Sequence, residues 1–149
     1  MAHTYTDLLS HIVFSTNDRR EFITPEIKPR LFAYMAGIGK NLKCKIHIVN
    51  GPSDHAHTLV ELPPSMSMSK LMKKFKANSS RLINDEFKGS RFAWQPGYSA
   101  FSVSRSNFKS VYNYIAEQEK HHLKMTFKQE LAALLIKHGI EYDERYIWN

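Results

Sequence analysis

The sequence predicts an α+β fold in which one antiparallel, ferredoxin-like sheet carries helices mainly on one face, followed by a C-terminal helix. Three observations support this prediction. Strand-like and helix-like segments follow one another in the order β-α-β-β-α-β, which is the split β-α-β arrangement. Turn-forming residues between the second and third strand segments predict a hairpin. The 149 residues, 42% of them hydrophobic, favour a single domain over residues 1–149.

Hydrophobic periodicity and turn residues define the elements of the N-terminal half. An apolar, β-branched segment predicts the first strand, and alternation of apolar and polar residues predicts the second. Between them, Thr24 as N-cap and Pro25 at the first helical position predict a helix start. The turn residues 50–54 (NGPSD) then lead into a third strand. The predicted elements are strand 5–14, helix 24–39, strand 43–49 and strand 55–62.

The C-terminal half is expected to contain one more strand and three helices. Ser67 or Ser69 is placed to cap the first of these helices, and Gly139 to end the last. The first helix has an inward-facing apolar stripe, which consists of Leu71, Phe75 and Leu82. The predicted elements are helix 67–87, strand 94–103 around Gly97, a helix capped by Ser104 or Ser106 that runs to about Gln118, and helix 126–138.

The charge balance indicates a polyanionic partner. Lys and Arg number 21 against 14 Asp and Glu, which gives a net charge of +7. Nucleic acid is the favoured partner, because a basic surface gains affinity when it releases phosphate counterions. The basic residues are spread over the chain, unlike those of a membrane-surface helix. Lys70, Lys74 and Arg81 share one side of the second predicted helix and are candidate DNA-binding residues, although a solvated helix face explains them equally.

Other features of the chain exclude several classes of protein. No apolar run approaches the roughly 18 residues of a membrane span, and the N-terminus lacks the pattern of a signal peptide. Cys44 is the single cysteine in the sequence, so neither a disulfide framework nor a thiolate zinc site is expected. These features suit a protein of the reducing cytoplasm.

The pair His55 and His57 is a candidate metal site. Residues i and i+2 of a strand point to the same face, so both imidazoles can reach one ion. By itself the pattern is weak, because a chain with eight histidines contains about 0.4 such pairs by chance. Its setting strengthens it, since two histidines in an apolar strand need polar partners to be buried.

The helix predicted over residues 106–118 offers two further candidates. Tyr114 and Gln118 are four residues apart and therefore lie on one face of the helix. They fall at one edge of its apolar stripe, where a tyrosine is more often a packing residue than a catalytic one. Tyr112, on the opposite edge, is the competing candidate nucleophile. The stripe consists of Phe108, Val111 and Ile115.

Four separated segments resemble, in order, the single-tyrosine transposases of small bacterial insertion sequences. These segments are DHAHTLVELP, WQPGYSAFSVS, YIAEQEKHH and GIEYDERYIW. The family belongs to the HUH superfamily, named for two histidines that flank a hydrophobic residue, and Ala56 is small for that middle position. The resemblance extends from about Tyr5 to Trp148 and therefore covers nearly the whole chain.

The resemblance implies a function and a role for four residues. His55 and His57 match the two metal-binding histidines, Tyr114 the nucleophile and Gln118 the third metal ligand. The implied activity is cleavage and rejoining of single-stranded DNA at insertion-sequence ends through a 5′-phosphotyrosine, with Mg²⁺ or Mn²⁺ as cofactor. The implied partners are hairpin-bearing DNA and a second copy of the chain, in a homodimer whose active sites are shared between subunits.

Two alternatives remain open on the sequence alone. One is a non-catalytic nucleic-acid-binding regulator on the same fold, and the other is a metallonuclease that uses water instead of a tyrosine. Among the weaker candidate residues, His121 and His122 are explained by favourable contacts with a helix C-terminus, although they are also potential metal ligands. Asp54 and Glu61 are potential partners of the metal ligands or alternative ligands.

Overall fold

The computed structural model describes residues 3–147, and so it includes all of the resemblance segments except Trp148, which lies outside the described residues. None of its helices is long and apolar enough to cross a membrane. The elements are β1 (Leu9–Ser15), the 3₁₀ turn η1 (Asn17–Arg19), α1 (Lys28–Asn41), β2 (Lys45–Asn50), β3 (His55–Glu61), α2 (Met68–Glu86), β4 (Ser99–Ser102), the 3₁₀ turn η2 (Arg105–Asn107), α3 (Phe108–Ala116), α4 (Gln118–His121) and α5 (Phe127–Lys137).

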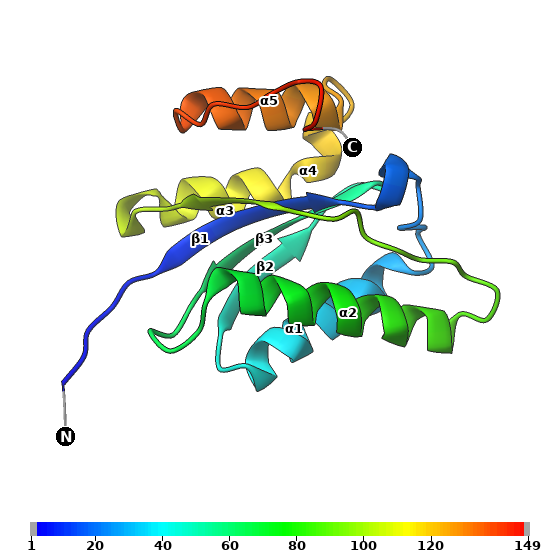
Figure 1. The fold of residues 1–149 in the computed structure, drawn as a ribbon, viewed down its shortest axis with the longest axis horizontal. Helices are drawn as coiled ribbons and strands as arrows, with labels where there is room; N and C mark the ends of the chain where they lie inside the picture. The colour runs from blue at the N-terminus through cyan, green and yellow to red at the C-terminus, as the bar shows by residue number, and fades with distance from the viewer. Residues whose placement is uncertain (1–2, 148–149) are drawn as a thin grey trace.

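The predicted α+β fold with a ferredoxin-like antiparallel sheet is confirmed, but helices cover both faces of the sheet instead of mainly one (Figure 1). The four strands form one sheet in the order β2-β3-β1-β4, and all three neighbouring pairs are antiparallel. The helices of the two crossovers, α1 and α2, lie together on one side of the sheet (Figure 1). The chain after β4 returns across the other side, where α3, α4 and α5 form a second layer (Figure 1).

Strand β3 separates the two buried faces of the sheet. Its residues alternate in direction, as the pleat requires. Ala56 and Val60 join the large core against α1 and α2. Leu59 points the other way and packs in a smaller cluster with Ile115 of α3. His55 and His57 share the direction of Leu59, so the pleat directs both imidazoles toward the layer of α3, α4 and α5.

Four predicted elements have boundaries that differ from those observed. The first strand begins at Leu9 instead of Tyr5, and the first helix begins at Lys28 instead of Thr24, because residues 25–27 form a turn. The strand expected over 94–103 is reduced to β4, because Trp94 forms an isolated bridge with Thr16 and the chain then turns at Gly97, whose φ is +85°. The helix expected to reach Gln118 ends at Ala116, and Glu117 leaves the helical conformation at φ −100° and ψ 23°. Gln118 therefore begins the short helix α4 instead of ending α3.

Helix α5 has a well-defined start at the predicted position. The Thr126 side chain accepts a hydrogen bond from the backbone N–H of Gln129, and the Gln129 side chain accepts one from the N–H of Thr126. This capping box satisfies two N–H groups that a helix N-terminus otherwise leaves unpaired. It fixes the orientation of the first turn of α5, and that turn ends on Glu130.

Candidate active site

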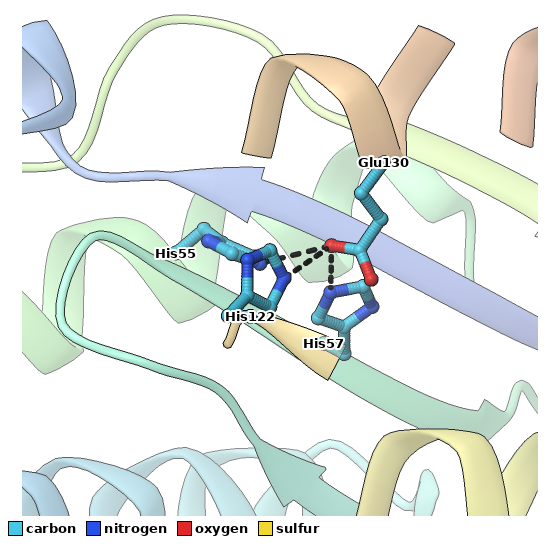
Figure 2. Close-up of side chains that lie close together, drawn as sticks. All are labelled: His55, His57, His122 and Glu130. Atoms are coloured by element: carbon cyan, nitrogen blue, oxygen red, sulfur yellow. Dashed lines mark hydrogen bonds and ion pairs between the residues drawn. The ribbon is translucent and has the colours of Figure 1, made fainter. Parts of the chain in front are cut away.

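The two histidines of β3 point at one carboxylate oxygen. Both side chains are fully buried. The Nε2 atom of His55 lies 3.0 Å from Oε1 of Glu130, and Nε2 of His57 lies 2.9 Å from the same oxygen. Glu130 itself is 1% exposed. The contact joins the N-terminal half of β3 to α5, over more than 70 residues of sequence (Figure 2).

A third imidazole completes the cluster. His122, in the turn that follows α4, places its Nε2 2.9 Å from Oε1 of Glu130 (Figure 2). One ligand atom from each of the four side chains lies within 4.8 Å of all the others. Three imidazoles and one carboxylate, all at least half-buried, form a donor set that suits a divalent metal ion.

Each histidine of β3 is oriented by a hydrogen bond at its other nitrogen. The Nδ1–H of His55 donates to Oδ1 of Asp54 at 2.7 Å. Nδ1 of His57 lies 2.8 Å from Nε2 of His11, which is buried on the neighbouring strand β1. Partners of this kind fix the ring orientation of metal-binding histidines. Here they leave both Nε2 atoms facing the centre of the cluster.

Tyr114 and Gln118 meet at the second oxygen of the same carboxylate. The Tyr114 hydroxyl donates a short hydrogen bond to Oε2 of Glu130, and Nε2 of Gln118 donates to Oε2 at 3.0 Å. The ring centroids of Tyr114 and His57 are 6.0 Å apart. Tyr112, by contrast, is exposed and stacks on Phe108. The structure thus brings Tyr114, and not Tyr112, to the histidine cluster.

Burial and hydrogen bonding set the protonation of the cluster. Burial lowers the pKa of His57 to about 4 and that of His11 to about 3, so both are neutral at pH 7. Burial also opposes the charge of His55, but hydrogen bonds to two carboxylates outweigh it and raise its pKa. Burial opposes the charge of Glu130 as well, yet the close contacts of its carboxylate with the three imidazoles hold its pKa well below the usual range.

The tyrosine is held in its protonated form. Burial, followed by the hydrogen bond to Glu130, raises the pKa of Tyr114 above its ordinary value of 10.0. A phenol with an unperturbed pKa near 10 is already only about 0.1% ionised at pH 7. Tyr114 therefore needs a change at the site, on binding of metal or substrate, before it becomes a good nucleophile.

The neutral histidines predict that the metal-free protein loses stability in mild acid. Below pH 6.5 the unfolded chain protonates His11 and His57 while the folded chain does not, so the free energy of unfolding falls with pH, by up to about 1.4 kcal/mol per pH unit for each histidine. The raised pKa of His55 has the opposite effect: it makes the free energy of unfolding fall as the pH rises, and only above pH 6.5. Urea denaturation in chelator at pH 6.5 and pH 5 measures the effect. A smaller pH dependence is expected in His11→Gln, and an equal one would contradict the assignment.

The sequence reasoning misses one residue of this cluster, Glu130, and names another, His122, only as a weaker candidate. Glu130 was not a candidate, although a signal exists: it lies in the buried stripe of α5, among Phe127, Leu131 and Leu135, where an acidic residue is unexpected. His122 was explained by contacts with a helix end, and the structure instead turns its ring into the cluster.

The three basic candidates lie elsewhere. Lys70, Lys74 and Arg81 are exposed on α2, which covers the opposite side of the sheet from α3 and α5 (Figure 1). Arg81 has an acidic neighbour one turn away, with Nη1 3.9 Å from Oδ2 of Asp85. The structure therefore does not bring these residues to the histidine cluster.

Comparison with known proteins shows the class of this protein: it is a transposase, an enzyme that cleaves and rejoins DNA. The chain belongs to the family described as "Transposase IS200 like", whose model matches residues 4–118. It is 28% identical over 124 residues to the transposase of insertion sequence IS200 from Salmonella typhimurium, and equally to that from Salmonella typhi. Each match covers 79% of this chain and 81% of the relative.

Two solved structures share the fold. One is a putative transposase from Deinococcus radiodurans, with a TM-score of 0.63 and 21% identity, over 79% of this chain and 96% of that one. The other is a REP-associated tyrosine transposase bound to a REP hairpin, with a TM-score of 0.61 and 15% identity, over 82% of this chain and 73% of that one. Both support the α+β fold with its four-stranded antiparallel sheet.

Proposed function

We propose that this transposase cleaves and rejoins single-stranded DNA at insertion-sequence ends, with Tyr114 as nucleophile and a divalent metal bound by His55, His57 and Gln118. One observation carries the proposal. The Tyr114 hydroxyl and the Nε2 atoms of both histidines converge on the two oxygens of one buried carboxylate, that of Glu130. Attack on a phosphodiester requires a nucleophile and a bound metal that both reach the same phosphate group. Tyr114 and the two histidines reach one small anionic group, the Glu130 carboxylate, in this way.

The residues present fit a divalent metal. The two histidines of β3 turn their Nε2 atoms inward, and Gln118 contributes a second feature: its Oε1 is buried with no hydrogen-bond partner in the described part of the chain. Rotation of the amide exchanges Oε1 with Nε2 and points the oxygen at the cluster. When bound, Mg²⁺ or Mn²⁺ would polarise the scissile phosphate and stabilise the charge that develops on it.

The chain's own residues account for the covalent step. The Tyr114 oxygen forms a bond to phosphorus while the bond from phosphorus to the 3′ oxygen breaks, which leaves a 5′-phosphotyrosine and a free 3′-hydroxyl. The phenolic proton leaves the tyrosine and the departing oxygen gains one, so the step is balanced. Because the phosphodiester energy is kept in the new bond, attack by another 3′-hydroxyl rejoins DNA without ATP.

Binding of hairpin-bearing single-stranded DNA is part of the proposal, and it is supported by the solved relative that holds a REP hairpin. We propose that Lys70, Lys74 and Arg81 contact DNA phosphates away from the cleavage site. Replacing all three by alanine is expected to weaken DNA binding and to reduce the slope of log affinity against log salt by about 2, since each phosphate contact on a single strand contributes about 0.7. Binding measured at several salt concentrations tests this, and an unchanged slope would assign the residues to a solvated face.

We also propose a homodimer with shared active sites, a feature implied by the resemblance. In the single chain, Tyr114 lies beside the histidines of its own sheet. The helical conformation is interrupted at Glu117, directly after the helix α3 that carries the tyrosine. Mixing Tyr114→Phe chains with His57→Ala chains tests the sharing, because activity returns in the mixture only if one subunit supplies the tyrosine and the other the metal site.

One experiment separates this proposal from its two alternatives. The protein is incubated with labelled single-stranded DNA from an insertion-sequence end and Mn²⁺, then run on a denaturing protein gel. A labelled protein band supports the covalent mechanism. Cleaved DNA without such a band indicates a water-dependent metallonuclease, and bound but uncleaved DNA indicates a regulator without catalytic activity.

A further inference from the structure

We propose that His122 and Glu130 are also metal ligands, so that the DNA-free protein holds its ion through three imidazoles and one carboxylate and prefers a transition-metal ion to magnesium. This inference rests on the proposed function for the presence of a metal, and in the DNA-free protein it places His122 and Glu130, in addition to the two histidines of β3 and in place of Gln118, around the ion. Both added residues lie beyond residues 4–118, which match the family model, so they are inferred from the contacts of this chain itself.

The hydrogen-bond count at one oxygen is the first argument. Oε1 of Glu130 lies 2.9–3.0 Å from the Nε2 atoms of His55, His57 and His122. A carboxylate oxygen has about two lone-pair sites, so it cannot accept three full N–H hydrogen bonds. A metal ion placed between the three nitrogens and the oxygen would resolve this conflict, because each of the four atoms would then donate one lone pair to the ion.

The distances are the second argument. In a tetrahedral site with bonds of about 2.0–2.1 Å, the ligand atoms lie about 3.3 Å apart. The four candidate atoms are all within 4.8 Å of one another, and the three contacts of the carboxylate oxygen measure 2.9–3.0 Å. To hold an ion, the carboxylate oxygen must move slightly outward and the widest pairs of ligand atoms must close from up to 4.8 Å toward about 3.3 Å; both are adjustments of side chains and not of the fold.

The placement of the two added residues is the third argument. The Glu130 side chain is 1% exposed and that of His122 11% exposed, although both come from the surface layer of the molecule. The ring centroid of His122 lies 4.5 Å from that of His55. Phe127 also packs on the His55 ring, with the two ring centroids 4.6 Å apart. The capped start of α5 and the turn after α4 thus close over the histidines of β3 from one side (Figure 2).

The ligand chemistry indicates the class of ion. Magnesium prefers oxygen ligands and keeps several waters, whereas imidazole nitrogens suit zinc and the later transition-metal ions, among them cobalt. Three imidazoles against one carboxylate oxygen form a nitrogen-rich set. We therefore expect the isolated protein to bind Co²⁺ or Zn²⁺ much more tightly than Mg²⁺.

The test measures metal affinity directly, without DNA or turnover. Co²⁺ is titrated into the chelator-treated full-length protein while its visible absorption is followed, and Mg²⁺ is then added as a competitor. The variants are His122→Ala and Glu130→Gln. The controls are His3→Ala, at an exposed histidine, and Glu119→Gln, at an exposed glutamate. Circular dichroism of each metal-free variant checks that the chain is folded, and His122 is the safer site because its side chain is partly exposed.

Both variants are expected to weaken Co²⁺ binding by at least about 100-fold, since the loss even of a residue that only orients a ligand costs about 10–100-fold. The two controls are expected to bind as the wild type does, and Mg²⁺ is not expected to displace Co²⁺. An unchanged dissociation constant in either variant, or equal affinity for the two ions, would overturn the inference. If those variants bind normally while His55→Ala does not, the metal of the proposed function stands; if the wild type binds no metal, both fail.

Discussion

Replacing Tyr114 by phenylalanine is expected to abolish the covalent protein–DNA adduct and to lower strand cleavage and joining by at least about 1,000-fold, because loss of an enzyme's nucleophile removes most of its rate enhancement. The substitution removes one oxygen and leaves the ring, which packs near His57 and stacks on His121. It also removes the hydroxyl that donates to Glu130. Metal affinity is therefore the second readout, and it is expected to be kept.

The matched control is Tyr112→Phe on the same helix. Tyr112 is exposed and stacks on Phe108, away from the histidine cluster, so this change is expected to leave adduct formation intact. Both variants are assayed for the labelled protein band with single-stranded DNA and Mn²⁺. The reverse pattern, with the band lost in Tyr112→Phe and kept in Tyr114→Phe, would show that the structure places the wrong tyrosine in the site.

The second large effect is expected from loss of the metal. Chelation, or replacement of His57 by alanine, is expected to reduce cleavage about 1,000-fold, the equivalent of the several kcal/mol that a bound cation contributes to a phosphoryl transition state. His57 is chosen because it is fully buried and its Nε2 faces the cluster. After chelation, activity is expected to return on addition of Mn²⁺ to the wild type but not to His57→Ala.

The control for this change is His3→Ala, at an exposed histidine near the N-terminus. The measurement is the initial rate of cleavage of labelled single-stranded DNA at a series of Mn²⁺ concentrations. Full activity in chelator would refute a metal-dependent mechanism. Full activity of His57→Ala in Mn²⁺ would instead remove this histidine from the metal site.

The fold was largely predictable because short-range rules determine its elements. The alternation of β3 places His55 and His57 on one face, and the spacing of four residues places Tyr114 and Gln118 together. The break at Glu117 was not predictable, since neither glycine nor proline marks it. Its consequence is local: Gln118 begins α4, yet its side chain still reaches the same carboxylate as Tyr114.

The composition of the cluster could be predicted only in part, for a physical reason. Glu130 and His122 reach it through packing of α5 and of the turn after α4 onto the sheet, and no periodicity within either segment encodes that long-range contact. For the same reason, the sequence could not predict how far Lys70 and Lys74 lie from the histidine cluster. A helical wheel gives the side of α2 on which they lie, but not the side of the sheet to which α2 belongs.

In the proposed mechanism, Tyr114 becomes joined to DNA at a site organised by His55 and His57. The most direct test of this mechanism is mass spectrometry of the protein after reaction with single-stranded insertion-sequence DNA and Mn²⁺, followed by nuclease and protease digestion. We expect a nucleotide linked by phosphate to the peptide that contains Tyr114, and we expect this product to be absent when His57 is replaced by alanine. A nucleotide on any other residue, or cleaved DNA with no modified peptide, would contradict the mechanism.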